Sequence, residues 1–299
     1  MTRNSISLTR ILTVLVLLVF CGHVAKAVLH YFFNTANLAP AMIEDFDGRD
    51  LDDLNPRIGK QFCCTHSAQL VDLEAYGGDG RALAIELRPD DSDVKGSKRA
   101  EIRLPASHFN KPVWYHIRLF KEQADPSPVP VTLLQWHAVP DKILLEGNRA
   151  PPLRLVEYED ENVIALNWDT APRSFDRFDL FGKKSGQILW QGPRTQDAWQ
   201  SWVFRVVWSV TEQGRITVWK DGERIVNYTG PTAYNDLAAP YMKAGIYVPR
   251  WKDPELAAGA AARRLLIDDI WEIYPAEAGA DIPPELQGLI SEMDHAAQE

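Results

Sequence analysis

The sequence predicts an all-β fold, a β-jelly roll in which two antiparallel sheets form a concanavalin-like sandwich with one concave, groove-forming face. Short runs between residues 43 and 274 alternate apolar and polar side chains with a period of two, as strands with one buried face do. Pro and Gly separate these runs, and no helical period continues for more than a few turns. The expected strands cover residues 83–88, 114–120, 131–137, 163–168, 202–210, 215–220, 242–247 and 265–274.

Two turns connect expected strands as hairpins. Glu212-Gln213-Gly214 separates residues 202–210 from 215–220, and Asp221-Gly222 is a two-residue turn that leads into 224–228. Many strands at short spacing, without crossover helices, favour a sandwich. Segments without alternation are expected to be loops over the sheet, and they cover residues 138–152 and 170–200.

The N-terminus has the organisation of a secretory signal peptide. Arg3 and Arg10 precede an apolar run at residues 11–20, and Ala25-Lys26-Ala27 offers small residues for cleavage. The run is about half of the ~20 apolar residues that a spanning helix needs, so an N-terminal membrane anchor is the less favoured alternative. We expect a secreted or periplasmic protein with no stable membrane association, organised as a signal peptide at 1–27, one β domain at 28–275 and an acidic tail at 276–299 in which a short helix can form.

Net charge argues against nucleic acid as a partner. The formal charge is −9, and loss of three positive residues with the signal peptide makes it −12. Residues 272–299 hold seven acids and no Lys or Arg, so the negative charge is concentrated in the tail. An anionic ligand must therefore bind at a local basic groove. Beyond such a ligand we expect no further partner and a monomeric protein.

The expected mature chain keeps two adjacent cysteines, Cys63 and Cys64. Disulfide geometry favours Cα atoms about 4.4–6.8 Å apart, whereas neighbouring Cα atoms lie about 3.8 Å apart. We therefore expect two free thiols, with an intermolecular bridge or a metal site as the alternatives.

Three short segments place polar side chains on one face of a strand and apolar side chains on the other. One face would carry Arg and Glu side chains from the first segment, Gln and His from the second, and Tyr and Lys from the third. Such a cationic, hydrogen-bonding surface suits a polymer that carries carboxylates. The segments are Arg99-Ala100-Glu101-Ile102-Arg103, Gln135-Trp136-His137 and Tyr241-Met242-Lys243-Ala244-Gly245-Ile246-Tyr247.

These residue types suit β-elimination in a uronic-acid polymer. The C5 proton becomes acidic only when the neighbouring carboxylate is neutralised, and Arg99, Gln135 and Arg103 can donate hydrogen bonds to it. His137 titrates near neutral pH and can act as general base, while Tyr247 can protonate the leaving oxygen, which suits guluronate or iduronate. In β-linked glucuronate or mannuronate the C5 proton and the leaving oxygen lie on the same side of the ring, so Tyr247 alone can serve as base and then acid. Lys243 on the same face could supply a cation that lowers the pKa of Tyr247.

The three motifs, in this order, resemble the jelly-roll polysaccharide lyases, which include heparin lyase I-like proteins, glucuronan lyases and, more distantly, alginate lyases. The resemblance covers roughly residues 43–274. It implies a lyase acting on glucuronan or a related polyuronate, with no cofactor required for the chemistry. Trp136 stands where alginate lyases usually have Ile or Val, which makes alginate the less secure substrate.

The resemblance also implies residue roles by position. Arg99, Gln135, His137 and Tyr247 match catalytic positions, and Arg103, Lys243 and Tyr241 match substrate-binding positions. Some related families bind a structural calcium near the last strand, where Asp268 and Asp269 could contribute ligands. A solvated pair of acids at the strand end is the alternative for these two.

Two other functions fit parts of the sequence. A glycoside hydrolase needs paired carboxyl groups, and Glu157, Glu159 and Glu161 alternate along one segment. A non-catalytic carbohydrate-binding protein is favoured by the ten Trp residues, which can stack on sugars.

Overall fold

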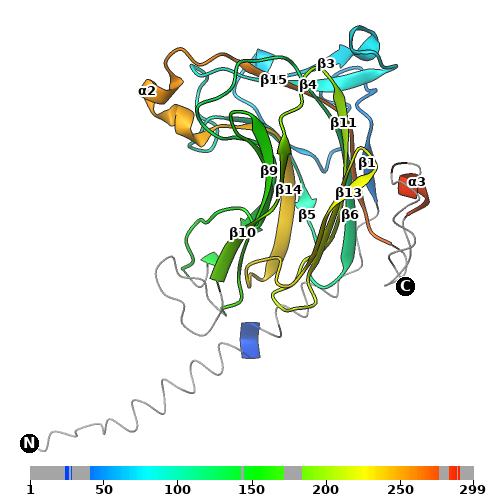
Figure 1. The fold of residues 1–299 in the computed structure, drawn as a ribbon, viewed down its shortest axis with the longest axis vertical. Helices are drawn as coiled ribbons and strands as arrows, with labels where there is room; N and C mark the ends of the chain where they lie inside the picture. The colour runs from blue at the N-terminus through cyan, green and yellow to red at the C-terminus, as the bar shows by residue number, and fades with distance from the viewer. Residues whose placement is uncertain are drawn as a thin grey trace, which may run out of the picture.

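The computed structural model describes residues 24–26, 28, 41–142, 145–171, 184–275, 283–287 and 289. The strands of this part of the chain form two antiparallel sheets, A and B, that pack face to face (Figure 1). The predicted jelly-roll sandwich is therefore confirmed.

Sheet A has the strand order β13-β12-β11-β6-β15-β4-β3, with β1 also paired to β15. Its central strands β6 and β15 pair along most of their length. The strands are β1 (Met42–Glu44), β3 (Ala68–Asp72), β4 (Arg81–Leu87), β6 (Pro112–Lys121), β11 (Trp199–Val207), β12 (Arg215–Lys220), β13 (Glu223–Thr229) and β15 (Arg263–Ile273).

Sheet B has the strand order β10-β9-β8-β7-β14-β5-β2 and is visibly curved in Figure 1. Its strands are β2 (Gly59–Gln61), β5 (Arg99–Ala106), β7 (Val131–Val139), β8 (Leu153–Glu157), β9 (Glu161–Asp169), β10 (Lys184–Pro193) and β14 (Ala238–Tyr247). Short helical turns occupy some connections: η1 (Thr65–Ser67), η2 (Leu73–Tyr76), η4 (Pro249–Lys252), α2 (Pro254–Ala257) and, near the C-terminus, α3 (Pro284–Gln287).

Each predicted strand has a counterpart, but the predicted loop at 170–200 is wrong in part. Residues 184–193 form β10, the edge strand of sheet B, with a register shift between Ile188 and Trp190. An edge strand has one unpaired side and is largely exposed, so it needs no strict apolar alternation. The exposed fraction of Ile188 is 59%.

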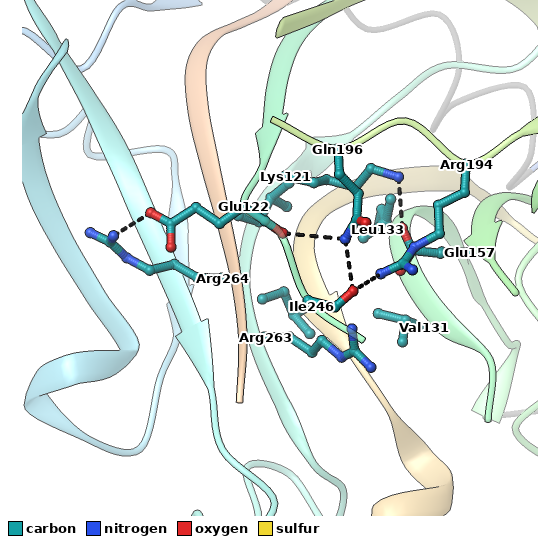
Figure 2. A pocket seen from close by; sticks show the side chains of 12 residues that line it. Lys121, Glu122, Val131, Leu133, Glu157, Arg194, Gln196, Ile246, Arg263 and Arg264 are labelled. Carbon is teal, nitrogen blue, oxygen red and sulfur yellow. Dashed lines mark hydrogen bonds and ion pairs between the residues drawn. The ribbon is translucent and has the colours of Figure 1, made fainter. Parts of the chain in front are cut away.

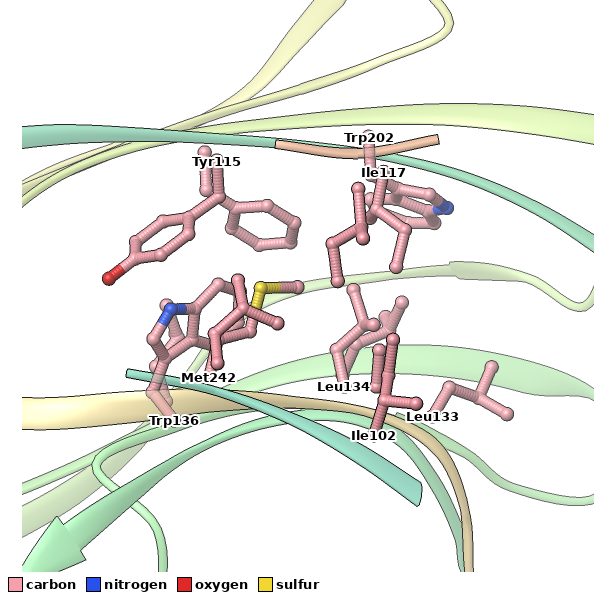
Figure 3. Close-up of a cluster of buried hydrophobic side chains, with 14 of the residues drawn as sticks. Ile102, Tyr115, Ile117, Leu133, Leu134, Trp136, Trp202 and Met242 are labelled. Carbon is pink, nitrogen blue, oxygen red and sulfur yellow. The ribbon is translucent and has the colours of Figure 1, made fainter. Parts of the chain in front are cut away.

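The core fills the space between the inner faces of the sheets. Trp136 of β7 is fully buried, and its ring lies 4.7 Å from that of Phe204 and 5.3 Å from that of Tyr115, both on sheet A. Figure 3 shows Trp136 and Met242 from sheet B facing Tyr115 across this interface. Trp136, which lies between Gln135 and His137 in the sequence, therefore packs sheet B against sheet A.

The cysteine prediction is wrong, because Cys63 and Cys64 form a disulfide with each other. Their Cα atoms are 3.7 Å apart, so the usual range of Cα separations is not a strict limit for neighbours. The bridge lies between β2 and η1, where Cys64 is extended with φ −134° and ψ 158°.

The two ends of the chain are described only in part. The predicted signal peptide lies outside the described residues except for positions 24–26, and no described helix is long and apolar enough to cross a membrane. Near the C-terminus, α3 begins at Pro284 and buries Leu286 against Trp114 and Trp219 on the outer face of sheet A. Acidic residues of the tail beyond position 289 lie outside the described residues.

Replacing Trp136 with Ala should lower the free energy of unfolding by about 3–5 kcal/mol, because it opens a cavity at the centre of the sandwich. Urea denaturation followed by circular dichroism measures the change. Ile188→Ala, at an exposed edge position, serves as the control and should shift the free energy by less than about 0.5 kcal/mol. Equal effects of the two substitutions would contradict the central position of Trp136.

Candidate active site

The three motif segments form three adjacent strands of sheet B, with β14 between β5 and β7. Lys243 at the middle of β14 pairs with Arg103 on one side and Gln135 on the other. One line across the sheet therefore carries a guanidinium, an amine and an amide.

All the polar motif residues lie on the face of sheet B that points away from sheet A. The residues between them, such as Ile102, Trp136 and Met242, belong to the core between the sheets. Because side chains alternate along a strand, the polar residues must lie on the opposite face. The expected shared face of the three segments is present in the structure.

Glu101 is the centre of the hydrogen-bond network on this face. Its carboxylate accepts from Arg99 Nη1 at 3.2 Å, from Lys243 Nζ at 3.1 Å and from the Gln135 amide. Lys243 Nζ also donates to Gln61 Oε1 at 2.9 Å. One carboxylate thus fixes donors from three strands, and Lys243, expected to act on Tyr247, is held by Glu101 and Gln61.

His137 lies beside Tyr241. Their rings are stacked with centroids 5.3 Å apart, and the Arg103 guanidinium is 5.4 Å from the centroid of the Tyr241 ring. His137 Nδ1 is 2.7 Å from the Ala138 carbonyl oxygen, which can only accept, so Nδ1 carries the proton. In the neutral ring Nε2 then keeps its lone pair.

Burial favours the neutral form of both rings. Desolvation is the largest influence on His137 and lowers its pKa, with Lys243 acting in the same direction and the Ala138 carbonyl against it. Desolvation also raises the pKa of Tyr241, more than the nearby Arg103 lowers it. At neutral pH the site therefore presents a neutral imidazole next to a protonated phenol.

Tyr247 lies at a different level of the sheet. It pairs with Arg99 on β5 and with Thr132 on β7, and the Arg99 guanidinium is 4.5 Å from its ring centroid. Thr132 precedes His137 by five residues, which is about 16 Å along an extended strand. The four predicted catalytic residues share one face. Arg99 contacts the Tyr247 ring and is linked to Gln135 through Glu101, whereas the ring next to His137 is that of Tyr241.

Two further residues of this face were not predicted as site residues. Gln61 comes from β2, a strand of three residues whose alternation is too short to recognise. Arg154 of β8 pairs with Gln135 and extends the line of donors, and its Nε is buried without a hydrogen-bond partner in the described part of the chain. The alternation of Leu153, Arg154 and Leu155 is the sequence signal that could have revealed it.

The acidic set proposed for a hydrolase is not on one strand. Glu157 ends β8, Glu159 lies in the turn, and Glu161 begins β9. Glu157 is buried and forms ion pairs with Lys121 and Arg194. Its partners are therefore cations and not a second carboxyl group. The alternating acids therefore mark the hairpin between β8 and β9 and not one face of a single strand.

The predicted calcium ligands lie on β15. Asp268 is ion-paired with Arg118, and the pKa of Asp268 is raised to about 6, mainly by burial. Burial also raises the pKa of Asp269, and the charges of Asp45 and Asp47, just after β1, act in the same direction. Oxygen donors of this kind suit calcium. The described groups of three His, Cys, Asp or Glu ligands within 4.8 Å of one another lie elsewhere, so calcium binding at Asp268 and Asp269 stays a prediction.

A family model described as polysaccharide lyase matches residues 43–271, which includes every strand of the candidate site. The chain belongs to the polysaccharide lyase family. No curated protein sequence gives a significant match.

The fold of the lyase is shared with solved structures. Endo-β-1,4-glucuronan lyase from Trichoderma reesei superimposes with a TM-score of 0.64 at 14% identity, covering 79% of this chain and 96% of that one. A marine alginate lyase from Aplysia kurodai gives a TM-score of 0.51 at 14% identity, covering 80% of this chain and 100% of the other. At this identity the likeness shows a common fold.

Replacing Glu101 with Gln should lower the free energy of unfolding by about 3 kcal/mol, because Lys243 is then buried without its counter-charge. Chemical denaturation at neutral pH measures the loss. Glu159→Gln changes the same group at an exposed turn and should be nearly neutral. A stability of Glu101→Gln equal to that of the control would contradict the central position of Glu101.

Proposed function

We propose that this lyase cleaves a uronic-acid polysaccharide, glucuronan or a related polyuronate, by β-elimination on the polar face of sheet B. The observation that carries the proposal is the line of donors from Arg103 through Lys243 and Gln135 to Arg154, beside a neutral His137. A chain of carboxylate-bearing sugars that crosses the strands would meet these donors in turn.

The first chemical requirement is to neutralise the carboxylate next to C5. Gln135 and Arg154 are neighbours across β7 and β8, and both can donate hydrogen bonds to that group. Donors of this kind stabilise the negative charge that develops as C5 loses its proton, typically by about 3–4 kcal/mol each. Glu101 holds Gln135 in place from the side opposite Arg154.

Proton transfer requires a base and an acid near the same sugar ring. We propose that His137 Nε2 takes the proton from C5, since its lone pair is free when Nδ1 donates to Ala138. A double bond forms between C4 and C5 as the bond from C4 to the glycosidic oxygen breaks. Tyr241, stacked on His137 and protonated at neutral pH, gives its proton to the departing oxygen.

The general acid is then Tyr241, which lies beside His137, and not Tyr247, to which the sequence motif assigned this role. Tyr247, whose ring contacts the Arg99 guanidinium, then lies farther along the polar face, where a further sugar of the polymer would bind. The two tyrosines are chemically identical, so position alone distinguishes them.

The substrate class is tested with a panel of glucuronan, alginate blocks, heparin, heparan sulfate, hyaluronan and xanthan. Elimination leaves an unsaturated uronate that absorbs in the ultraviolet, and we expect the largest absorbance increase with glucuronan. Reducing ends without ultraviolet absorbance would indicate a hydrolase. Binding without cleavage of any polymer would indicate a carbohydrate-binding protein.

The two tyrosines are tested by comparing Tyr241→Phe with Tyr247→Phe on the best substrate of the panel. Loss of general-acid catalysis typically costs 10²–10⁴-fold, so Tyr241→Phe should lower kcat by at least about 10²-fold. Tyr247→Phe should mainly raise KM. The opposite pattern would return the acid role to Tyr247, and each variant is the control for the other.

We also propose that the enzyme acts outside the cytoplasm as a monomer. Support comes from the basic, apolar and Ala-x-Ala series at residues 1–27, and from the Cys63–Cys64 disulfide, which suits an oxidising compartment. An exported enzyme would meet its polymer outside the cell.

A further inference from the structure

A second group of charged side chains lies inside the sandwich, on the core side of sheet B. Lys121 ends β6, Arg263 begins β15 and Glu157 ends β8. Each is two residues from a core leucine, Leu119, Leu265 and Leu155 respectively, so alternation turns it inward. Three strands thus place charges at positions where their pattern calls for apolar residues.

Two of the cations here are paired with the carboxylate. Lys121 Nζ donates to Glu157 Oε2 at 2.6 Å, and Arg194 Nε lies 3.1 Å from Glu157 Oε1. Arg194 Nη2 also donates to the Ala124 carbonyl at 2.8 Å. Figure 2 shows Glu157 between these two cations, with Arg263 on the lower side of the pocket.

Arg263 is the third cation of this group, and it is not one of the two that form ion pairs with Glu157. Its exposed fraction is 7%, and its Nε and Nη1 are buried without a hydrogen-bond partner in the described part of the chain. Burial lowers the pKa of Arg263 more than the charges of Glu157 and the exposed Asp125 raise it, and Arg194 lowers it further. Three cations therefore share one buried carboxylate, and an uncompensated buried charge is costly.

A cavity separates these groups. It has a volume of about 20 Å³ and is lined by Lys121, Glu157, Arg194 and Arg263, with Val131 and Ile246 as apolar walls. Glu122 and Arg264 also line it, and because they are ion-paired with each other they leave the excess of positive charge unchanged. This volume holds about one water molecule or one ion of similar size. A neighbouring surface hollow shares Ala124, Arg194 and Gln196 with the cavity.

We propose that this cavity is a binding site for a small monovalent anion such as chloride. The anion would accept hydrogen bonds from Arg263 Nε and Nη1 and balance the excess positive charge between the sheets. A water molecule could accept the same hydrogen bonds but would leave the charge uncompensated. Because the cavity opens on the core side of sheet B, the site is separate from the polar face that carries the candidate catalytic residues.

The location of the anion is tested with crystals of the full chain grown or soaked in sodium bromide. Bromide is close in size to chloride and scatters anomalously, so a peak is expected in the cavity next to Arg263. A cavity without an anomalous peak, or one that refines as water in bromide, would overturn the proposal. This measurement needs no variant.

The contribution to stability is tested by thermal unfolding at constant ionic strength, exchanging methanesulfonate for chloride. Methanesulfonate is too large for the cavity, so chloride should raise the Tm of the native chain by at least about 2 °C. Arg263→Met should lose this response, whereas Arg250→Met, which removes an exposed arginine, should keep it. A full chloride response in folded Arg263→Met would overturn the proposal, and if that variant does not fold, the bromide experiment decides.

Discussion

The buried carboxylate of Glu101 is the interaction on which the candidate active site depends. The exposed fraction of Glu101 is 2%, and a buried carboxylate is tolerated only when hydrogen-bond donors and cations compensate its charge. Here the donors come from β5, β7 and β14. The same contacts decide where Gln135 and Lys243 point. A single acid therefore organises the polar face of sheet B.

The backbone next to Glu101 is adapted to this packing. Gly245 pairs with Glu101, has a φ of 141° and would bring a Cβ within 2.3 Å of the Ala100 carbonyl oxygen. A side chain at this position would therefore require the two strands to move apart. The glycine in the Tyr241–Tyr247 segment allows the close approach that places Lys243 beside the carboxylate.

The sequence was sufficient for the fold and for the face of the site, because both follow from the period of two. Trp136 shows why, since its burial between Gln135 and His137 requires that both neighbours face outward. The two-residue alternation along a strand does not predict the register between neighbouring strands. Only the pairing of Tyr241 with His137 and of Tyr247 with Thr132 reveals which tyrosine is near the imidazole. Arg154, Gln61 and the inward-facing Arg263 were missed for a related reason, because their importance comes from neighbours on other strands.

The bond between Cys63 and Cys64 affects the chain in a particular way. A disulfide stabilises a fold largely by closing a long loop in the unfolded chain, and a bridge between neighbours closes almost none. Its influence is therefore local: it stiffens the backbone two residues after Gln61, whose amide oxygen holds Lys243. The redox state of these two cysteines is therefore coupled to the segment that follows β2 at the edge of sheet B and, through Gln61, to the polar face.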